Sequence, residues 1–114
     1  DKLGEAIKRS SSKKVLIDHH LFPENFADFV LSDTTASSTC ELVYDFILLL
    51  EMGHLIDPII GDCLYTGILT DTGSFKHATT PKLFRTVAKL VEIGVDDNSI
   101  QDKIFNALKL NHKV

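Results

Sequence analysis

Short apolar runs alternate with longer periodic segments along this chain, and together they predict an α/β arrangement. The continuous apolar run at residues 15–17 is typical of a buried parallel strand. It is followed by a polar segment and a loop around Pro23, and residues 29–31 form a weaker strand candidate near a sheet edge. From apolar spacing, caps and glycine stops, helices are predicted for residues 1–9, 38–52, 59–70, 82–93 and 97–108. Because helices outnumber strands, further strands of the sheet are expected outside this chain.

The helix predicted for residues 59–70 is apolar nearly all round, which is typical of a helix buried in a core. Its start is marked by Asp57, a capping carboxylate, and by Pro58 at the first helical position. Gly61 and Gly67 lower helix propensity within it. We therefore expect a neighbouring element to pack closely against these two glycines.

Composition is that of an ordinary globular protein, with 44% hydrophobic and 25% charged residues among 114. The net charge of −4 and the lack of a basic stripe do not predict nonspecific binding to nucleic acid or anionic membranes. The longest apolar run, residues 46–50, is too short to cross a bilayer, so we expect no membrane association. Cys40 and Cys63 lack metal-site spacing and lie in apolar helical patterns, which predicts buried thiols in a reducing, cytoplasmic setting. The arginines and most lysines are expected on the surface.

The triplet Asp18, His19 and His20 directly follows the strand predicted for residues 15–17. In open α/β sheets, ligands bind beyond the carboxyl ends of strands, so this position suits a functional site. A carboxylate and two imidazoles can provide a metal ligand, a supporting hydrogen-bond partner and a phosphate contact. Alternation along an extended chain predicts that His19 points away from Asp18 and His20. Taken alone, such a triplet is more often part of a solvated loop.

Three segments, in order and with matching spacing, resemble the DHH phosphoesterase family. Residues 15–20 (VLIDHH) resemble its third signature motif, residues 35–42 (TASSTCEL) the start of the next helix, and residues 67–75 (GILTDTGSF) its fourth motif. The resemblance is to oligoribonucleases that also remove phosphate from adenosine 3′,5′-bisphosphate, often labelled exopolyphosphatase-related, and to related cyclic-dinucleotide phosphodiesterases. It implies that residues 1–114 are a helix-rich fragment of a parallel-sheet α/β DHH domain.

The family resemblance also implies a metal-dependent hydrolase with two divalent cations per full site. The usual metal is manganese (Mn2+), with magnesium or cobalt as alternatives, and carboxylate and imidazole ligands suit it. His19 and Asp71 match the family's ligands of the second metal. His20 matches the catalytic residue that contacts the phosphate, and Asp18 matches the acid that supports the histidines.

The implied substrate is a short oligonucleotide or a nucleotide phosphate, and a homodimer is compatible with the resemblance. Two alternatives stay open: hydrolysis of inorganic polyphosphate or pyrophosphate, and a catalytically inactive relative that only binds nucleotide. Ser37 and Ser38 are candidate phosphate contacts at a helix N-terminus, although simple capping is favoured. Lys76 and His77 are candidate substrate contacts, with a solvated loop as the equal alternative.

Two other interpretations of the segment after residue 70 are weaker. Asp71-Thr72-Gly73 is also the aspartic-protease tripeptide, but that chemistry needs two such loops in a β-rich setting. Here the tripeptide ends an apolar helix. Phe75 could stack on a base, but a position in the core is favoured.

The sequence departs from the family pattern on both sides of the matched motifs. The family's upstream His-x-x-x-Asp-x-Asp motif and a further bridging aspartate are not found in residues 1–17. The downstream substrate-binding domain with its glycine-rich motif is likewise not found in the sequence. Since His19 and Asp71 are only part of the expected ligand set, we expect the isolated chain to be catalytically inactive and to bind metal weakly or not at all.

Overall fold

The computed structural model describes residues 1–21 and 25–112, with side chains described as far as residue 109. The loop predicted around Pro23 lies outside the described residues. The arrangement is α/β and helix-rich, as predicted, with a small parallel sheet. In chain order, the described elements are α1 (Lys2–Arg9), β1 (Val15–Asp18), β2 (Phe29–Ser32), α2 (Thr39–Leu49), the 3-10 helix η1 (Gly53–Leu55), α3 (Pro58–Asp71), α4 (Pro81–Ile93) and α5 (Asp97–His112).

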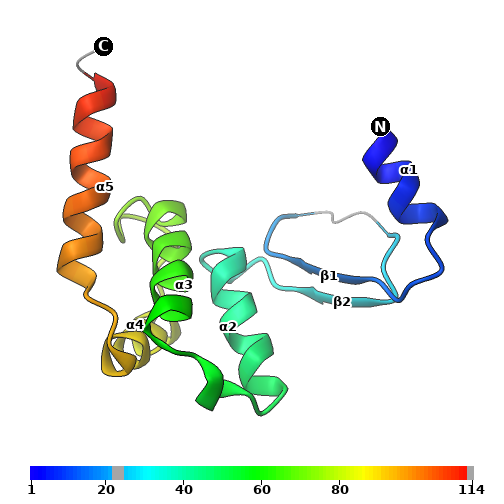
Figure 1. Cartoon of the computed structure of the whole chain (residues 1–114), viewed down its shortest axis with the longest axis horizontal. Helices are drawn as coiled ribbons and strands as arrows, with labels where there is room; N and C mark the ends of the chain where they lie inside the picture. Colours follow the sequence, from blue (N-terminus) through cyan, green and yellow to red (C-terminus); the bar gives the residue numbers. More distant parts are fainter. Residues whose placement is uncertain (22–24, 113–114) are drawn as a thin grey trace.

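The two strands run parallel, with Val15 opposite Phe29 and Asp18 opposite Ser32. Both strands therefore end at the same edge of the sheet, and Figure 1 shows this edge beside α2. Beyond the last paired residues, the N–H of Asp33 donates to the carbonyl of Asp18 at 3.2 Å. This bond holds the segment after β2 against the end of β1, where the Asp18-His19-His20 triplet begins.

The hydrophobic core lies among the helices, with α3 at its centre. α3 packs against α2 on one side and against α4 and the start of α5 on the other (Figure 1). The most deeply buried core side chains come from α3 and α4, and they are Tyr65, Ile68, Leu69, Leu83 and Leu90. This core fixes the C-terminal end of α3, where Asp71 is the last helical residue.

Phe75 anchors the segment that follows α3. Its half-buried ring lies between those of Tyr65 and Phe84, with centroid separations of 6.1 and 5.9 Å. Both spacings lie within the range favoured by aromatic pairs. The core position expected for Phe75 is therefore confirmed.

Both glycines of α3 lie where another segment of the chain packs closely against the helix. A Cβ atom on Gly67 would overlap the sulfur of Cys40 in α2 and lie 3.0 Å from the Cys40 Cβ. A Cβ atom on Gly61 would lie 2.8 Å from a methyl carbon of Val95. The close packing predicted for both glycines is confirmed.

Two helix bounds and two burial predictions need correction. α2 ends at Leu49 rather than near residue 52, because Glu51 adopts a left-handed backbone with φ of 58°. α5 continues to His112 rather than ending near residue 108. The first turn of α3 is open to solvent, with Ile59 74% exposed, and Cys63 is exposed rather than buried.

The sheet end of the molecule is more open than the helical core. The radius of gyration is 16.2 Å, whereas about 13 Å is typical of a compact domain of this length. Large apolar side chains on the sheet and on α1 are exposed, among them Leu3, Val15, Phe29 and Val30. No described helix combines the length and the apolar character needed to cross a lipid bilayer.

Candidate metal centre

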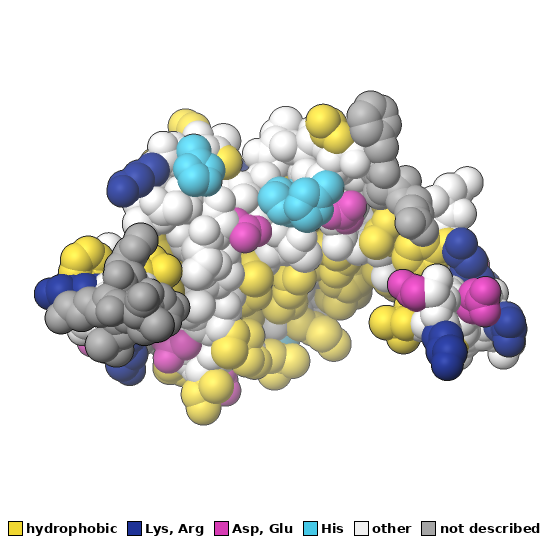
Figure 2. Space-filling model, turned by 90° about the horizontal axis from the view of Figure 1, so that it is seen from above, with side chains coloured by type: hydrophobic (Ala, Val, Ile, Leu, Met, Phe, Trp, Pro, Cys, Tyr) yellow, Lys and Arg dark blue, Asp and Glu magenta, His cyan; other side chains and the backbone are white. Residues whose placement is uncertain are grey.

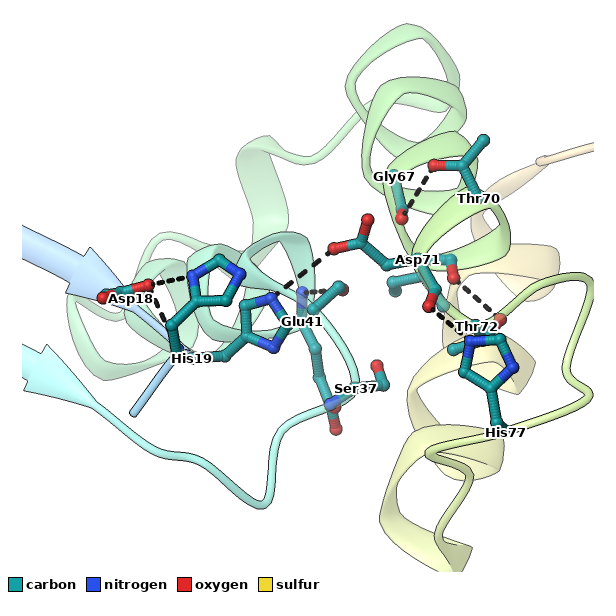
Figure 3. Close-up of polar contacts among 12 residues, drawn as sticks. Asp18, His19, Ser37, Glu41, Gly67, Thr70, Asp71, Thr72 and His77 are labelled. Atoms are coloured by element: carbon teal, nitrogen blue, oxygen red, sulfur yellow. Dashed lines mark hydrogen bonds and ion pairs between the residues drawn. The ribbon is translucent and has the colours of Figure 1, made fainter. Parts of the chain in front are cut away.

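The side chains of His19 and Asp71 face each other across the gap between the sheet edge and α3 (Figure 3). The Nε2 atom of His19 and the Oδ2 atom of Asp71 lie 3.7 Å apart. That distance is too long for a hydrogen bond. It does suit two ligands of one divalent cation that is bonded to each of them at about 2.1 Å. The predicted convergence of these residues is confirmed, and their role as metal ligands stays a prediction.

The donor chemistry of this pair suits a transition-metal cation. Imidazole nitrogen and carboxylate oxygen are ligands accepted by manganese, cobalt and zinc. The His19 side chain is 19% exposed and that of Asp71 is 50% exposed, so both reach solvent. Among the described residues, no cluster of three or more His, Cys, Asp and Glu side chains is arranged to hold a metal ion. The pair therefore fits part of a metal site that needs further ligands.

Asp18 holds the ring of His20. Its Oδ1 atom lies 2.7 Å from Nδ1 of His20 and accepts the His20 backbone N–H at 3.1 Å. The backbone bond first, and then the ring bond, hold the pKa of Asp18 below its ordinary value. An ionised Asp18 requires a proton on Nδ1, which leaves Nε2 directed toward solvent on a ring that is 73% exposed. The geometry suits contact between His20 and an anionic ligand.

The rings of His19 and His20 lie against each other, with centroids 4.2 Å apart and planes tilted by 47°. The prediction that the two rings point in opposite directions is therefore wrong. β1 ends at Asp18, so strand alternation does not extend through the two histidines. They still have different partners, Asp71 for His19 and Asp18 for His20. Figure 2 shows histidine side chains gathered between acidic ones on this face of the molecule.

The N-terminus of α2 is capped by its own side chains. The hydroxyl of Ser38 accepts the N–H of Glu41 at 3.1 Å, and Oε1 of Glu41 accepts the N–H of Ser37 at 2.8 Å. Capping by Ser38 is thus confirmed. The negative charge of the Glu41 carboxylate lies in the first turn of α2, where it interacts favourably with the positive end of the helix dipole. The hydroxyl of Ser37 is buried and has no hydrogen-bond partner among the described residues. A phosphate contact by Ser37 or Ser38 stays a prediction.

The segment after Asp71 folds back on the end of α3. Ring atom Nε2 of His77 lies 3.2 Å from the Asp71 carbonyl, and the His77 N–H donates to the carbonyl of Thr72. Gly73 has φ of 56°, and a Cβ there would come within 2.7 Å of the His77 ring. Lys76 instead lines a groove beside α5. Of the two candidate substrate contacts, His77 is the one that the structure places against Asp71, and binding by either stays a prediction.

Sequence reasoning missed the most buried charge near the site. Glu41 is 2% exposed, and Nζ of Lys82 donates to its Oε2 at 3.0 Å and to Oδ2 of Asp45 at 2.7 Å. Burial raises the pKa of Glu41, but the bonds from the Ser37 N–H and from Lys82 outweigh it, so the pKa lies below its ordinary value. The Ser-x-x-Glu spacing of a capping box could have identified Glu41. Lys82 lies 41 positions along the chain from Glu41, so no local sequence pattern indicates their pairing. Its side chain is 52% exposed, in agreement with the surface position expected for it.

The Glu41–Lys82 pair predicts a loss of stability in acid. Because the native pKa of Glu41 is lowered, its contribution is complete above the ordinary value of 4.5 and is lost as the pH falls through the lower native value. Urea midpoints of wild type and Glu41→Gln should differ most near about pH 7 and converge near about pH 3. A difference that stays constant over this range would contradict the lowered pKa.

The fold and the site define an α/β domain with a candidate metal centre beyond the carboxyl end of a parallel strand. Residues 1–68 match the DHH family, N-terminal domain. This match covers more than half of the chain, and its C-terminal limit lies within α3. The chain therefore belongs to the DHH family.

Similar proteins match this chain over nearly all of its length. The uncharacterized protein MG371 of Mycoplasma genitalium is 38% identical over 104 residues, which cover 90% of this chain and 32% of the relative. The bifunctional oligoribonuclease and PAP phosphatase NrnA of Bacillus subtilis is 30% identical over 108 residues, covering 90% of this chain and 34% of NrnA. The solved structure of an exopolyphosphatase-related protein from Bacteroides fragilis superposes with a TM-score of 0.89 at 33% identity, covering 93% and 32% of the two chains. The chain thus spans about a third of the length of these relatives.

Proposed function

We propose that this chain contributes to a manganese-dependent phosphoesterase site that hydrolyses short oligonucleotides or nucleotide phosphates. The observation that carries the proposal is the 3.7 Å approach of His19 and Asp71 beyond the end of β1. Membership of the DHH family and similarity to proteins named oligoribonuclease and PAP phosphatase support the reaction class. The free thiols of Cys40 and Cys63 are consistent with the reducing cytoplasm as its setting.

In the proposed site, the residues of this chain bind and orient the phosphate. Bound divalent cations would neutralise charge on the phosphate and make water a stronger nucleophile. His19 and Asp71 would each donate one ligand atom to such a cation. His20, with Nδ1 fixed by Asp18, presents Nε2 to a phosphate oxygen when its ring is protonated. His77 holds the backbone of Asp71 from the other side.

A second candidate substrate is inorganic polyphosphate or pyrophosphate. The specific observation in its favour is the superposition on a protein named exopolyphosphatase-related. Both candidates use the same ligand pair and the same phosphate contact. They differ in whether the site also recognises a sugar and a base.

Hydrolysis by the full-length protein with manganese tests the proposal. We expect phosphate release from adenosine 3′,5′-bisphosphate and mononucleotide release from short oligoribonucleotides to be faster than phosphate release from polyphosphate or pyrophosphate. The isolated 114-residue chain is expected to be inactive with every substrate, since its described residues supply two candidate ligands rather than a full cluster. A preference for polyphosphate would favour inorganic polyphosphate or pyrophosphate as the substrate over nucleotide phosphates and oligonucleotides. Nucleotide binding without any hydrolysis would indicate an inactive, nucleotide-binding member.

A further inference from the structure

The first turn of α4 contacts α2 through Lys82 and the segment after α3 through Phe84. We propose that Lys82, in this turn, is a positioning residue that fixes the separation between His19 and Asp71. The inference rests on the proposed function and deepens it, because it concerns the same cation site. Two continuous paths of contacts lead from this turn, one toward each ligand.

The first path runs from Lys82 to the end of β1. Nζ of Lys82 donates to Oε2 of Glu41 at 3.0 Å, and Oε1 of Glu41 accepts the N–H of Ser37 at 2.8 Å. Ser37 ends the short segment that starts at Asp33, whose N–H donates to the carbonyl of Asp18 at 3.2 Å. Asp18 directly precedes the ligand histidine. A shift of the lysine would therefore be transmitted through hydrogen bonds to the residue beside that ligand.

The second path runs from the same helical turn to the end of α3. Phe84, two residues after Lys82, packs against Phe75 with ring centroids 5.9 Å apart. The N–H of Phe75 donates to the hydroxyl of Thr72 at 3.0 Å, and that hydroxyl donates to the carbonyl of Ile68 at 2.8 Å. Thr72 is fully buried and directly follows the ligand aspartate. The first turn of α4 is thus linked to both ligands by packed or hydrogen-bonded groups.

The contact between α4 and α2 depends on the positive charge of Lys82. Its ammonium group lies between two carboxylates, at 3.0 Å from Glu41 and 2.7 Å from Asp45. Glu41 is almost fully buried, and a buried carboxylate that loses its cation must take up a proton or move toward water. Either response would break the contact between α4 and the N-terminus of α2. The spacing between the two ligand segments would then change.

Manganese binding by the full-length protein tests the role of Lys82. Titration of MnCl2 by calorimetry, with thermal unfolding in parallel, would compare wild type, Lys82→Met and Lys89→Met. Lys82→Met should weaken Mn2+ binding by about 10-fold or more, the usual effect of losing a group that supports metal ligands. Lys89 is a matched control on the same helix, because its pair with Glu92 is exposed. Lys89→Met should bind as wild type does.

The double variant Glu41→Gln/Lys82→Met separates positioning from simple stability. Removing both charges leaves no unpaired buried carboxylate, so its melting temperature should recover toward wild type. Under the positioning role, its Mn2+ affinity stays about 10-fold below wild type. Wild-type affinity in either Lys82 variant would overturn the inference. Absence of Mn2+ binding by the wild type would instead overturn the proposed function.

Discussion

Replacing Asp71 by alanine is expected to lower manganese-dependent hydrolysis by the full-length protein by about 1,000-fold or more. The substitution removes the carboxylate of Asp71, whose Oδ2 atom lies 3.7 Å from Nε2 of His19 in the candidate centre. Stabilisation of transition-state charge by a bound cation contributes several kcal/mol, and each 1.4 kcal/mol corresponds to about a tenfold change in rate. The measurement is kcat/KM for adenosine 3′,5′-bisphosphate at saturating manganese.

Asp62→Ala is the matched control for this substitution. Asp62 is an exposed aspartate on the same helix, and its side chain makes no hydrogen bond or ion pair with the described residues. Its replacement should leave kcat/KM within about twofold of wild type, because surface changes away from a site have small effects. Equal activity of Asp71→Ala and Asp62→Ala would show that Asp71 is not a metal ligand.

Replacing Gly67 by alanine is expected to destabilise the fold by about 1–3 kcal/mol, the usual range for overpacking a helix contact. A methyl group at this position overlaps the sulfur of Cys40, so α2 and α3 must separate. The gain in helix propensity, about 1 kcal/mol, opposes this cost and is included in the net range. Because Asp71 lies on the same helix one turn after Gly67, manganese affinity should fall as well. Urea unfolding measures the first effect and Mn2+ titration the second.

The double variant Gly67→Ala/Cys40→Ala identifies the cause of that loss. Removal of the sulfur vacates most of the space that the added methyl group requires. The double variant should therefore be more stable than Gly67→Ala, and Cys40→Ala alone should be close to wild type. If Cys40→Ala gives no rescue, the sulfur contact is not what makes glycine necessary at position 67.

The sequence predicts those parts of the fold that depend on local chemistry. Helix starts at Ser38 and Asp57 follow from side chains that accept their own helix's N–H groups, and both caps are present in the structure. The position of the Asp18-His19-His20 triplet follows from the short apolar strand before it, which is only partly buried in the structure. The approach of His19 and Asp71 is implied by the resemblance to DHH phosphoesterases, in which the matching residues bind one metal. Local periodicity alone does not predict it.

The features that sequence reasoning missed depend on contacts between distant segments. The pairing of Glu41 with Lys82 joins helices that are 41 positions apart, and no local pattern indicates it. The tilted contact between the His19 and His20 rings is possible because β1 stops at Asp18, the last residue that pairs with β2. Tertiary packing also decides that Cys63 is exposed, although its neighbours in sequence are apolar.

Anomalous X-ray diffraction from crystals of the full-length protein grown with manganese tests the central claim most directly. The hypothesis that His19 and Asp71 hold a common cation predicts a manganese peak bonded to Nε2 of His19 and to an Asp71 carboxylate oxygen, each at about 2.2 Å. Manganese peaks located elsewhere, with the His19 and Asp71 side chains bonded to no metal, would contradict it.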